Sequence, residues 1–500
     1  MKTYKEQIGE LKDLLREGAV IGAIEQLLAW DQWTGMPAGA IQFRTETVKY
    51  VSGLTSAHFT GPRAQALAKY FGEADLAGIE CIYERGAVRK FLRQYKQYNS
   101  IPPGLVMEFA GLSSEAQTKW VEAVSNSDFN ILKPSVKQLF AMKTEMAKHL
   151  GGEDILETMM QIYDEGVSID EWKTEAEKVK IAVKRLLNRI RESGKTIDDS
   201  FLLKEFDKKE LFEFAKYIAQ AAGYDPGKGG FGQVPHPFAS QLGPKDARMT
   251  TNCETYSFGV LAALHEAGHA MYGYGGDAET DDYSLFGGIH GGFHEGQSRF
   301  YENIIGRSKP FWSCHYHEAQ KRFPQFGGVS LDDYYAAINK VSMNIRRIHA
   351  DEVSYCLHPI LRVELEAELI YGQLSFDDLP EAWNTKYREY LGICPEGDAD
   401  GVLQDVHWSM GLIGYFQSYA LGNMYSGQII GVVKEALPDL DAQLESGDIT
   451  HLNRWMYENI WHYGCVFTAG ELIERVSGGP LNADHYIAYL EEKFGALYSL

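Results

Sequence analysis

Apolar residues recur every three or four positions along most of the chain, which is the spacing that places side chains on one face of an α-helix. Clear runs of this kind are Ile8, Leu11, Leu14 and Leu15 near the start, and Leu186, Leu187 and Ile190 further along. Charge-rich stretches such as residues 170–195 are interpreted as solvated helix faces. The pattern predicts a protein built mainly from helices.

One segment breaks the helical pattern. Residues 223–237 are dense in Gly and Pro, and residues 246–250 then alternate between polar and apolar side chains. Alternation is the period of a half-buried strand, with Asp246, Arg248 and Thr250 on one face. We therefore expect a short sheet edge before the next helix.

Two helices are predicted after this strand. The apolar positions of the first are Val260, Leu261, Leu264 and Met271. This helix ends at the glycines between 273 and 276, and a Gly-rich connection over 287–292 leads to a second helix beginning near His294. Nine of the fifteen histidines lie between positions 236 and 358, and such crowding calls for a chemical explanation.

The composition is that of a large globular protein. Of the 500 residues, 45% are hydrophobic and 12% aromatic, so the chain can bury a sizeable core and is not disordered. The length fits about three domains, or equally a single large helical fold with two lobes. Acidic side chains outnumber basic ones by 69 to 48, which gives a net charge of -21. This charge argues against binding to nucleic acid or to an anionic membrane surface.

The cysteines and the N-terminus indicate the cellular compartment in which the protein is expected. The six cysteines include no C-x-x-C pair, so neither a disulfide framework nor a thiolate zinc knuckle is indicated, and a reducing compartment is expected. The charged N-terminus lacks the apolar stretch of a signal peptide, and no apolar run reaches the roughly eighteen residues that span a bilayer. The sequence predicts a cytoplasmic protein.

His265-Glu266-Ala267-Gly268-His269 is an H-E-x-x-H motif within the predicted helix. Histidines four residues apart lie one turn from each other on the same face, so both imidazoles can bind one ion. Glu266 is rotated by about 100° from His265, too far round to join the same ligand set but well placed to take a proton from the attacking water. We predict His265 and His269 as metal ligands and Glu266 as the general base. The alternative is a helix with two hydrogen-bonded core histidines.

A catalytic zinc site needs a third protein ligand and an open fourth position. The best candidate is Glu295, which lies 26 residues beyond the motif, near the start of the next predicted helix. The alternative interpretation of Glu295 is a surface ion pair with Arg299, four residues further on. His290 and His294 compete for the same role, whereas the third histidine of a metzincin is absent because position 275 is Gly.

Cys314-His315-Tyr316-His317 is a weaker candidate for a second metal site. Histidines two residues apart point to different faces of a helix, and no further ligand follows at a suitable spacing. We interpret this segment as ordinary surface.

Six motifs follow one another in a fixed order along the chain. They are His236-Pro237-Phe238, Asp246-Ala247-Arg248-Met249-Thr250, the H-E-x-x-H motif, His294-Glu295-Gly296-Gln297, Arg347-Ile348-His349-Ala350-Asp351 and Gly401-Val402-Leu403-Gln404-Asp405-Val406-His407-Trp408. Together they resemble the motifs of the M32 metallocarboxypeptidases, also called the thermostable carboxypeptidase Taq family, and the resemblance covers nearly the whole chain. The sequence departs from the family at Arg346, where an aliphatic residue is usual, and at His349, where an acidic residue is common.

The resemblance implies an all-α, two-lobed molecule with a deep cleft, similar to neurolysin and angiotensin-converting enzyme, with a small β-sheet beside the zinc helix. It also implies one catalytic domain over residues 1–500, homodimers, and one Zn²⁺ per chain that Co²⁺ or another divalent ion can replace. The implied activity is the removal of single C-terminal residues from peptides, with broad specificity.

A carboxypeptidase must recognise a free α-carboxylate, and a buried arginine does this through two parallel hydrogen bonds. Arg347 is our first candidate and Arg248 the second, and the resemblance places both at the substrate end of the cleft. The alternatives are structural ion pairs, of Arg347 with Asp351 and of Arg248 with Asp246.

The developing oxyanion also needs a hydrogen-bond donor in addition to the metal. His407 and Tyr415 are the candidates, with Tyr419 as a neighbour of the latter. His236 precedes a proline and therefore has extended backbone, so we expect it to shape the wall of the substrate cleft.

Two other functions stay open from the sequence. An oligoendopeptidase or dipeptidase would use the same zinc site, and a catalytically lapsed scaffold would bind peptides without cleaving them. The complete set of predicted ligands favours an enzyme, because a protein that only binds peptides has no physical need for Glu266.

Overall fold

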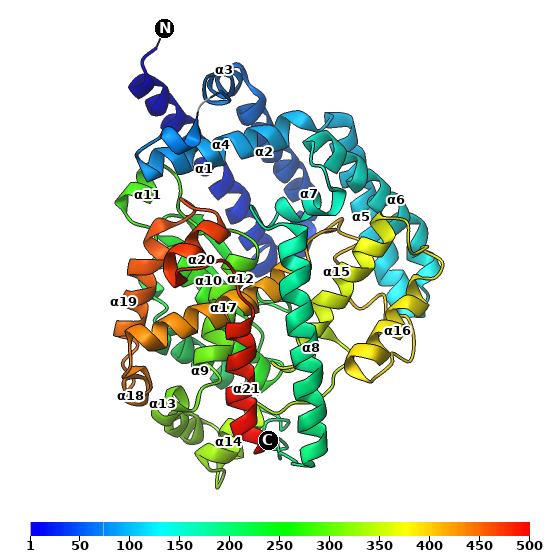
Figure 1. The fold of residues 1–500 in the computed structure, drawn as a ribbon, viewed down its shortest axis with the longest axis vertical. Helices are drawn as coiled ribbons and strands as arrows, with labels where there is room; N and C mark the ends of the chain where they lie inside the picture. Colours follow the sequence, from blue (N-terminus) through cyan, green and yellow to red (C-terminus); the bar gives the residue numbers. More distant parts are fainter. Residues whose placement is uncertain (1, 74) are drawn as a thin grey trace.

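The computed structural model describes residues 2–73 and 75–500, and it is mostly helical (Figure 1). The helices before residue 200 are α1 (Tyr4–Thr34), α2 (Ile41–Thr60), α3 (Pro62–Phe71), α4 (Ile82–Ser100), α5 (Pro103–Asn126), α6 (Phe129–Leu150), α7 (Ile155–Gln161) and α8 (Ile169–Ser193). The predicted apolar faces of α1 and α8 are confirmed, because the side chains that define them are buried.

The middle of the chain contains the sheet and the helices around it. The strands are β1 (Phe231–Gln233), β2 (Ala239–Gly243) and β3 (Asp246–Thr251), and the helices are α9 (Lys208–Ala221), α10 (Tyr256–Gly273), α11 (Ala278–Asp282), α12 (Gly292–Arg299), α13 (Lys309–Arg322) and α14 (Leu331–Ile338). The final part adds α15 (Leu357–Ile370), α16 (Leu379–Leu391), α17 (Gln417–Ala436), α18 (Leu440–Glu445), α19 (Thr450–Asn459), α20 (Ala469–Ser477) and α21 (Asp484–Tyr498). The predicted class, all-α with a small sheet, is confirmed.

The three-stranded sheet has the order β1-β3-β2. The central strand β3 pairs in parallel with β1 and antiparallel with β2, with Met249 opposite both Phe231 and Ala239. The alternation in the sequence therefore predicted β3 correctly. Because β2 pairs only with β3 among the described strands, its other edge is free.

Helix α10 carries the H-E-x-x-H motif through the centre of the protein. It begins after Thr255, whose hydroxyl accepts a hydrogen bond from the backbone N–H of Phe258, and it ends at Gly273 as predicted. Its apolar side chains are buried because β3, α9 and α12 all pack against it. A helix covered on several sides holds the imidazoles of the motif in fixed positions.

Glycines set the spacing between α10, α12 and α17. A Cβ at Gly268, inside the motif, would lie 2.5 Å from the carbonyl oxygen of Gln297 in α12. A Cβ at Gly422 in α17 would lie 2.5 Å from Cγ of Glu295. Only glycine permits such close backbone approach, so these two positions bring α12 tightly between its neighbours and place Glu295 beside α10.

One connected cluster of buried apolar side chains extends from Ile8 in α1 to Tyr498 in α21. The long helices α8 and α21 lie side by side along one surface of this core (Figure 1). Among the described residues, no helix combines the length and the apolar character that crossing a membrane requires.

Candidate metal centre and active site

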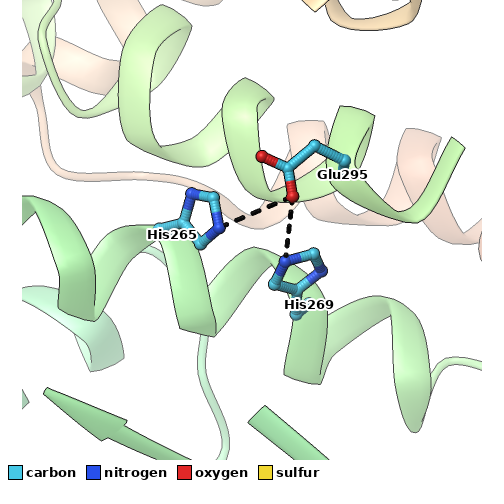
Figure 2. Close-up of side chains that lie close together, drawn as sticks. All are labelled: His265, His269 and Glu295. Carbon is cyan, nitrogen blue, oxygen red and sulfur yellow. Dashed lines mark ion pairs between the residues drawn. The ribbon is translucent and has the colours of Figure 1, made fainter. Parts of the chain in front are cut away.

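The side chains of His265, His269 and Glu295 converge between α10 and α12 (Figure 2). The Oε2 atom of Glu295 lies 3.7 Å from Nε2 of His265 and 3.5 Å from Nε2 of His269. These atoms are too far apart for ordinary hydrogen bonds but suitably spaced to surround one ion. The structure thus brings together the three residues that the sequence predicted as a ligand set.

The tautomer of His265 leaves the correct nitrogen free for an ion. Its Nδ1 atom lies 2.8 Å from Oε2 of Glu302. A carboxylate accepts a hydrogen bond from the Nδ1–H group, so the lone pair of the imidazole is on Nε2, which faces Glu295. Glu302 lies in the π-helical turn Phe300–Ile305 that continues α12, and π turns often occur at functional sites.

The tautomer of His269 is set by a second histidine. Nε2 of His294 lies 3.1 Å from the carbonyl oxygen of Gly287, which can only accept, so this Nε2 carries a proton. Burial keeps the pKa of His294 well below its usual range, so its Nδ1 has a free lone pair. Nδ1 of His269 lies 2.6 Å away and must donate, which leaves the lone pair of His269 on Nε2. His294 therefore orients a predicted ligand rather than replacing Glu295.

Arg299 holds the other oxygen of Glu295. Its Nε donates to Oε1 of Glu295 at 2.9 Å, and its Nη1 donates to Glu302 at 3.1 Å. Burial opposes ionisation of Glu295, but His265 and Arg299 keep the pKa of this carboxyl below its usual range, so it is a carboxylate. The ion pair that was the alternative interpretation of Glu295 is therefore present alongside the predicted ligand geometry.

The surroundings of the His265 imidazole favour positive charge. Burial alone would lower the pKa of His265, but Glu295, Glu302 and Glu266 together raise it to about 9. Two neutral nitrogens and one carboxylate oxygen, in a pocket with further negative charge around it, suit a divalent cation. The residues present therefore fit a metal ion.

Glu266 differs from the other two carboxylates beside the centre. Its side chain is buried and forms no hydrogen bond or ion pair with any described residue. Burial raises its pKa above the usual value, and the neighbouring carboxylates add to this rise, while His265 and His269 oppose it. An unpartnered carboxylate with a raised pKa is poised to accept and return a proton.

A cavity of about 850 Å³ opens onto this centre. Its walls come from α1, α2, α4, the β2 strand, α10, α12 and α17, and they include Glu266 together with the three residues of the metal group. Tyr415 and Tyr419 line the same cavity, and Nε2 of His407 lies 3.1 Å from the hydroxyl oxygen of Tyr419. His407 also stacks against Tyr415, so these three candidates form one group beside the metal centre.

Arg347 lies behind this aromatic group and is buried. Its Nε and Nη2 donate to Oδ1 of Asp405 at 3.0 and 2.9 Å, and its guanidinium lies 4.5 Å from the centre of the Tyr419 ring. The alternative pair with Asp351 is wrong, because that carboxylate accepts hydrogen bonds from the backbone of its own turn, at Ser354 and its neighbour. The sequence missed Asp405 as the partner, since 58 residues separate the two.

The other predicted substrate-binding residues are further from the centre. Arg248 donates to Asp246 at 3.0 and 2.8 Å, which is the local ion pair named as its alternative, and it lines a separate hollow beside Trp30. His236 is exposed, and the residues that follow it, from Pro237 onward, line the main cavity. His290 is open to the cavity but does not belong to the metal group.

The Cys314–His317 segment contains no second metal group. Within residues 2–73 and 75–500, His265, His269 and Glu295 form the one cluster with metal-ligand spacing. His317 bonds to the carbonyl oxygen of Cys314, and His315 pairs with the hydroxyl of Tyr217 at 2.9 Å. The prediction of a surface position is wrong for His315, whose ring is buried against α9.

The sequence did not predict a role at the metal centre for Glu302 or Arg299, which lie beside the proposed ligands. The sequence could have shown that these residues are neighbours of Glu295, because Glu295, Arg299 and Glu302 are spaced by four and three residues and so lie on one helix face. Their connection to His265 depends on how α12 packs against α10, which spacing along one helix does not reveal.

The profile of the family described as carboxypeptidase Taq (M32) metallopeptidase matches residues 10–494. The chain belongs to this M32 family. It is 34% identical to Carboxypeptidase 1 of Bacillus subtilis, over 100% of this chain and 99% of that protein. It is also 34% identical to Thermostable carboxypeptidase 1 of Thermus thermophilus, over 98% of each.

Solved structures agree with the family assignment. The M32 carboxypeptidase from Deinococcus radiodurans superposes with a TM-score of 0.95 at 34% identity, covering 99% of this chain and 100% of the other. The protein is therefore a metallocarboxypeptidase, a hydrolase acting on peptide bonds, and M32 membership implies a divalent metal ion and peptide substrates.

Proposed function

We propose that this M32 enzyme is a zinc-dependent carboxypeptidase that releases single C-terminal residues from peptides with broad specificity. The observation that carries the proposal is the convergence of His265, His269 and Glu295 in the wall of a cavity, beside Glu266, a buried carboxylate that pairs with no described residue. Zn²⁺ is the ion most often bound by two histidines and a glutamate in hydrolases, and Co²⁺ or another divalent ion is expected to substitute.

The ion supplies Lewis-acid activation of the attacking water and of the scissile carbonyl. Glu266 accepts a proton from the water and then donates it to the nitrogen of the departing residue. Tyr415 and Tyr419 carry hydroxyl groups in the cavity wall that can donate to the developing oxyanion, and His407 holds the hydroxyl of Tyr419. The raised pKa of Glu266 suits a group that both takes and returns a proton.

The free edge of β2 supports an extended substrate. Residues from Pro237 to Leu242 line the cavity, and β2 is paired on one side only among the described strands. An extended peptide can add to such an edge through backbone hydrogen bonds, which do not depend on side-chain identity. This mode of binding fits broad specificity.

For the terminal carboxylate we propose Arg347 first and Arg248 second. Arg347 is supported by its position directly behind Tyr419, which lines the cavity. Arg248 is supported by its place on β3, next to the cavity-lining strand β2. His236 is proposed to shape the entrance, since the residues after it form part of the wall.

One peptide, prepared as the free acid, the C-terminal amide and the N-acetylated form, can test whether the enzyme cleaves at the C-terminus of its substrate. We expect single residues to leave the free acid and its acetylated form, while the amide is cleaved at least about a hundredfold more slowly because it lacks the charged acceptor that the proposed arginine would bind. Mass spectrometry of the products decides between the alternatives. Internal cuts in both acid and amide would favour an oligoendopeptidase. Cleavage of free dipeptides but not of this longer peptide would favour a dipeptidase, and no cleavage of either by the zinc-loaded protein would favour a lapsed peptide-binding scaffold.

The metal assignment has its own test. Elemental analysis should find about one zinc per chain, and a chelator should abolish activity until Zn²⁺ or Co²⁺ is returned. An active protein that holds no transition metal after reconstitution contradicts the assignment.

We further propose that residues 1–500 form one catalytic domain with two lobes, and that the enzyme is a cytoplasmic homodimer. The connected core supports a single domain. All six cysteines are free, which suits a reducing compartment. Large apolar side chains exposed on α1 and α2 offer a surface for a second copy.

A further inference from the structure

The cavity at the metal centre contains an unneutralised cation that the sequence did not single out. Of the described residues that line this cavity, Lys90 is the one lysine or arginine. It belongs to α4, far from the six motifs in the sequence. Arg347 and Arg248 are not among the lining residues.

The ammonium group of Lys90 has unused donors. Its Nζ donates to the backbone carbonyl of Ser284 at 2.6 Å, and it forms no ion pair with any described residue. An ammonium group has three N–H donors, so two remain for a ligand. By contrast, the guanidinium groups of Arg347 and Arg248 are already paired, with Asp405 and Asp246 respectively.

The side-chain amide of Gln94, one turn further along α4, also lacks hydrogen-bond partners among the described residues. Its side chain lines the same cavity and forms no hydrogen bond within the part of the chain that the structure describes, so its two Nε2–H donors are available to a ligand. Its Oε1 atom is buried without a partner among the described residues, but it only accepts hydrogen bonds and so would not bind a carboxylate itself. Positions 90 and 94 lie on one helix face, so Lys90 and Gln94 can meet the same ligand.

We propose that Lys90, together with the amide of Gln94, binds a carboxylate of the peptide substrate. This inference rests on the proposed peptidase function and names a residue that selects the substrate. The chemistry of an ammonium beside an amide matches a carboxylate, which a peptide offers either at its C-terminus or on an acidic side chain.

The competing explanation is structural. Lys90 could serve only to hold the loop at Ser284, in which case its loss weakens the fold or slows every substrate alike. The two explanations differ in one measurable quantity, the dependence of binding and turnover on a carboxylate in the peptide.

The test compares wild type with Lys90→Met, which keeps most of the apolar stem, and with Lys90→Arg, which keeps the charge. Lys96→Met, an exposed lysine on the same helix, is the matched control. For each metal-loaded protein, kcat/KM is measured with peptide pairs that differ only by Glu or Gln at each of the last three positions. Calorimetry with the Glu266→Gln form of each protein measures binding of the same peptides as free acid and as amide.

We expect Lys90→Met to lose roughly tenfold to a hundredfold in binding of the carboxylate-bearing member of a pair, and Lys90→Arg to recover most of it. A loss confined to Glu-containing peptides identifies the side chain as the source, and a loss confined to free acids identifies the terminus. An equal loss for every peptide, or an unchanged carboxylate dependence, overturns the proposal. Failure of the peptidase function itself would show separately, as wild-type protein that binds peptides without cleaving them.

Discussion

Among the carboxylates beside the metal centre, Glu266 is the one that pairs with no described residue. Glu295 is held by Arg299, and Glu302 is held by both Arg299 and His265. A paired carboxylate is fixed in its charged form, whereas an unpaired buried one can exchange a proton. The local hydrogen bonds therefore separate the predicted base from the residues that build the centre.

Replacing Glu266 by Gln should lower kcat by about 10²- to 10⁴-fold, because the amide cannot accept the proton of the attacking water. Metal content and melting temperature should stay close to those of wild type, since Glu266 pairs with no described residue. Glu254→Gln, at an exposed position just before α10, is the control and should be fully active. Near wild-type kcat in Glu266→Gln with bound metal would remove this residue from the mechanism.

The buried ion pair of Asp405 gives a second prediction at this scale. Asp405 accepts from both Arg347 and Arg362, and all three side chains are nine-tenths or more buried. Asp405→Asn leaves two buried guanidinium groups without their counter-ion and should cost about 3–5 kcal/mol of unfolding free energy. Denaturant unfolding measures this loss.

Asp400→Asn is the matched control for this measurement. Asp400 pairs with Arg346 at 2.8 Å, but both side chains are about half exposed, and surface pairs contribute about 1 kcal/mol or less. If the two variants lose the same free energy, burial of the Asp405 cluster is not what makes it important.

At the scale of whole elements, the candidate active site depends on how closely three helices approach. The predicted ligands come from α10 and α12, and α17 presses against the back of α12. The glycines at 268 and 422 permit this distance. Asp164 adds a polar link, since it accepts hydrogen bonds from the N–H of Gly292 at the start of α12 and from the Ser418 hydroxyl in α17.

Gly422→Ala should therefore disturb the centre, although residue 422 is not itself a predicted ligand. The added methyl would lie 2.5 Å from Cγ of Glu295, so α12 must shift. We expect zinc affinity to fall by about tenfold or more, as when groups that orient a ligand are lost, measured by competition with a chelator of known affinity. Gly431→Ala in the same helix meets its nearest atom only at 3.5 Å and should bind zinc normally. Equal zinc affinity in both variants would contradict this account of helix spacing.

At the scale of the whole molecule, the distribution of exposed apolar side chains bears on the proposed homodimer. Val20, Ile24 and Leu27 are exposed in α1, and Phe43, Tyr50 and Leu54 are exposed in α2, which packs against α1. Clustered apolar exposure of this kind is typical of surfaces that bind another protein.

The double variant Phe43→Asp, Tyr50→Asp should be monomeric at concentrations where wild type is a dimer, because two charges would have to be desolvated in the interface. Light scattering after size exclusion measures the mass of each form. Met107→Asp on α5 changes a side chain that is 75% exposed, compared with 76% for Phe43, and serves as the control. A dimer that survives the double change lies on another face.

Much of this protein follows from its sequence because the relevant information is local. Helical periodicity predicted the buried face of α1, the alternation at 246–250 predicted β3, and a four-residue spacing placed His265 and His269 on one face. These predictions hold because backbone geometry alone determines which side chains within one element share a face. The family motifs extended this local information to the class of fold and the class of reaction.

The tertiary structure decided the relations between elements. It made Asp405 rather than Asp351 the partner of Arg347, joined Glu302 to His265, and brought Lys90 of α4 into the wall of the metal cavity. Periodicity says which face of a helix is buried, but it does not say which other helix covers that face. That choice depends on packing across the whole core, where a glycine at 268 or 422 sets a distance that no spacing along the chain encodes.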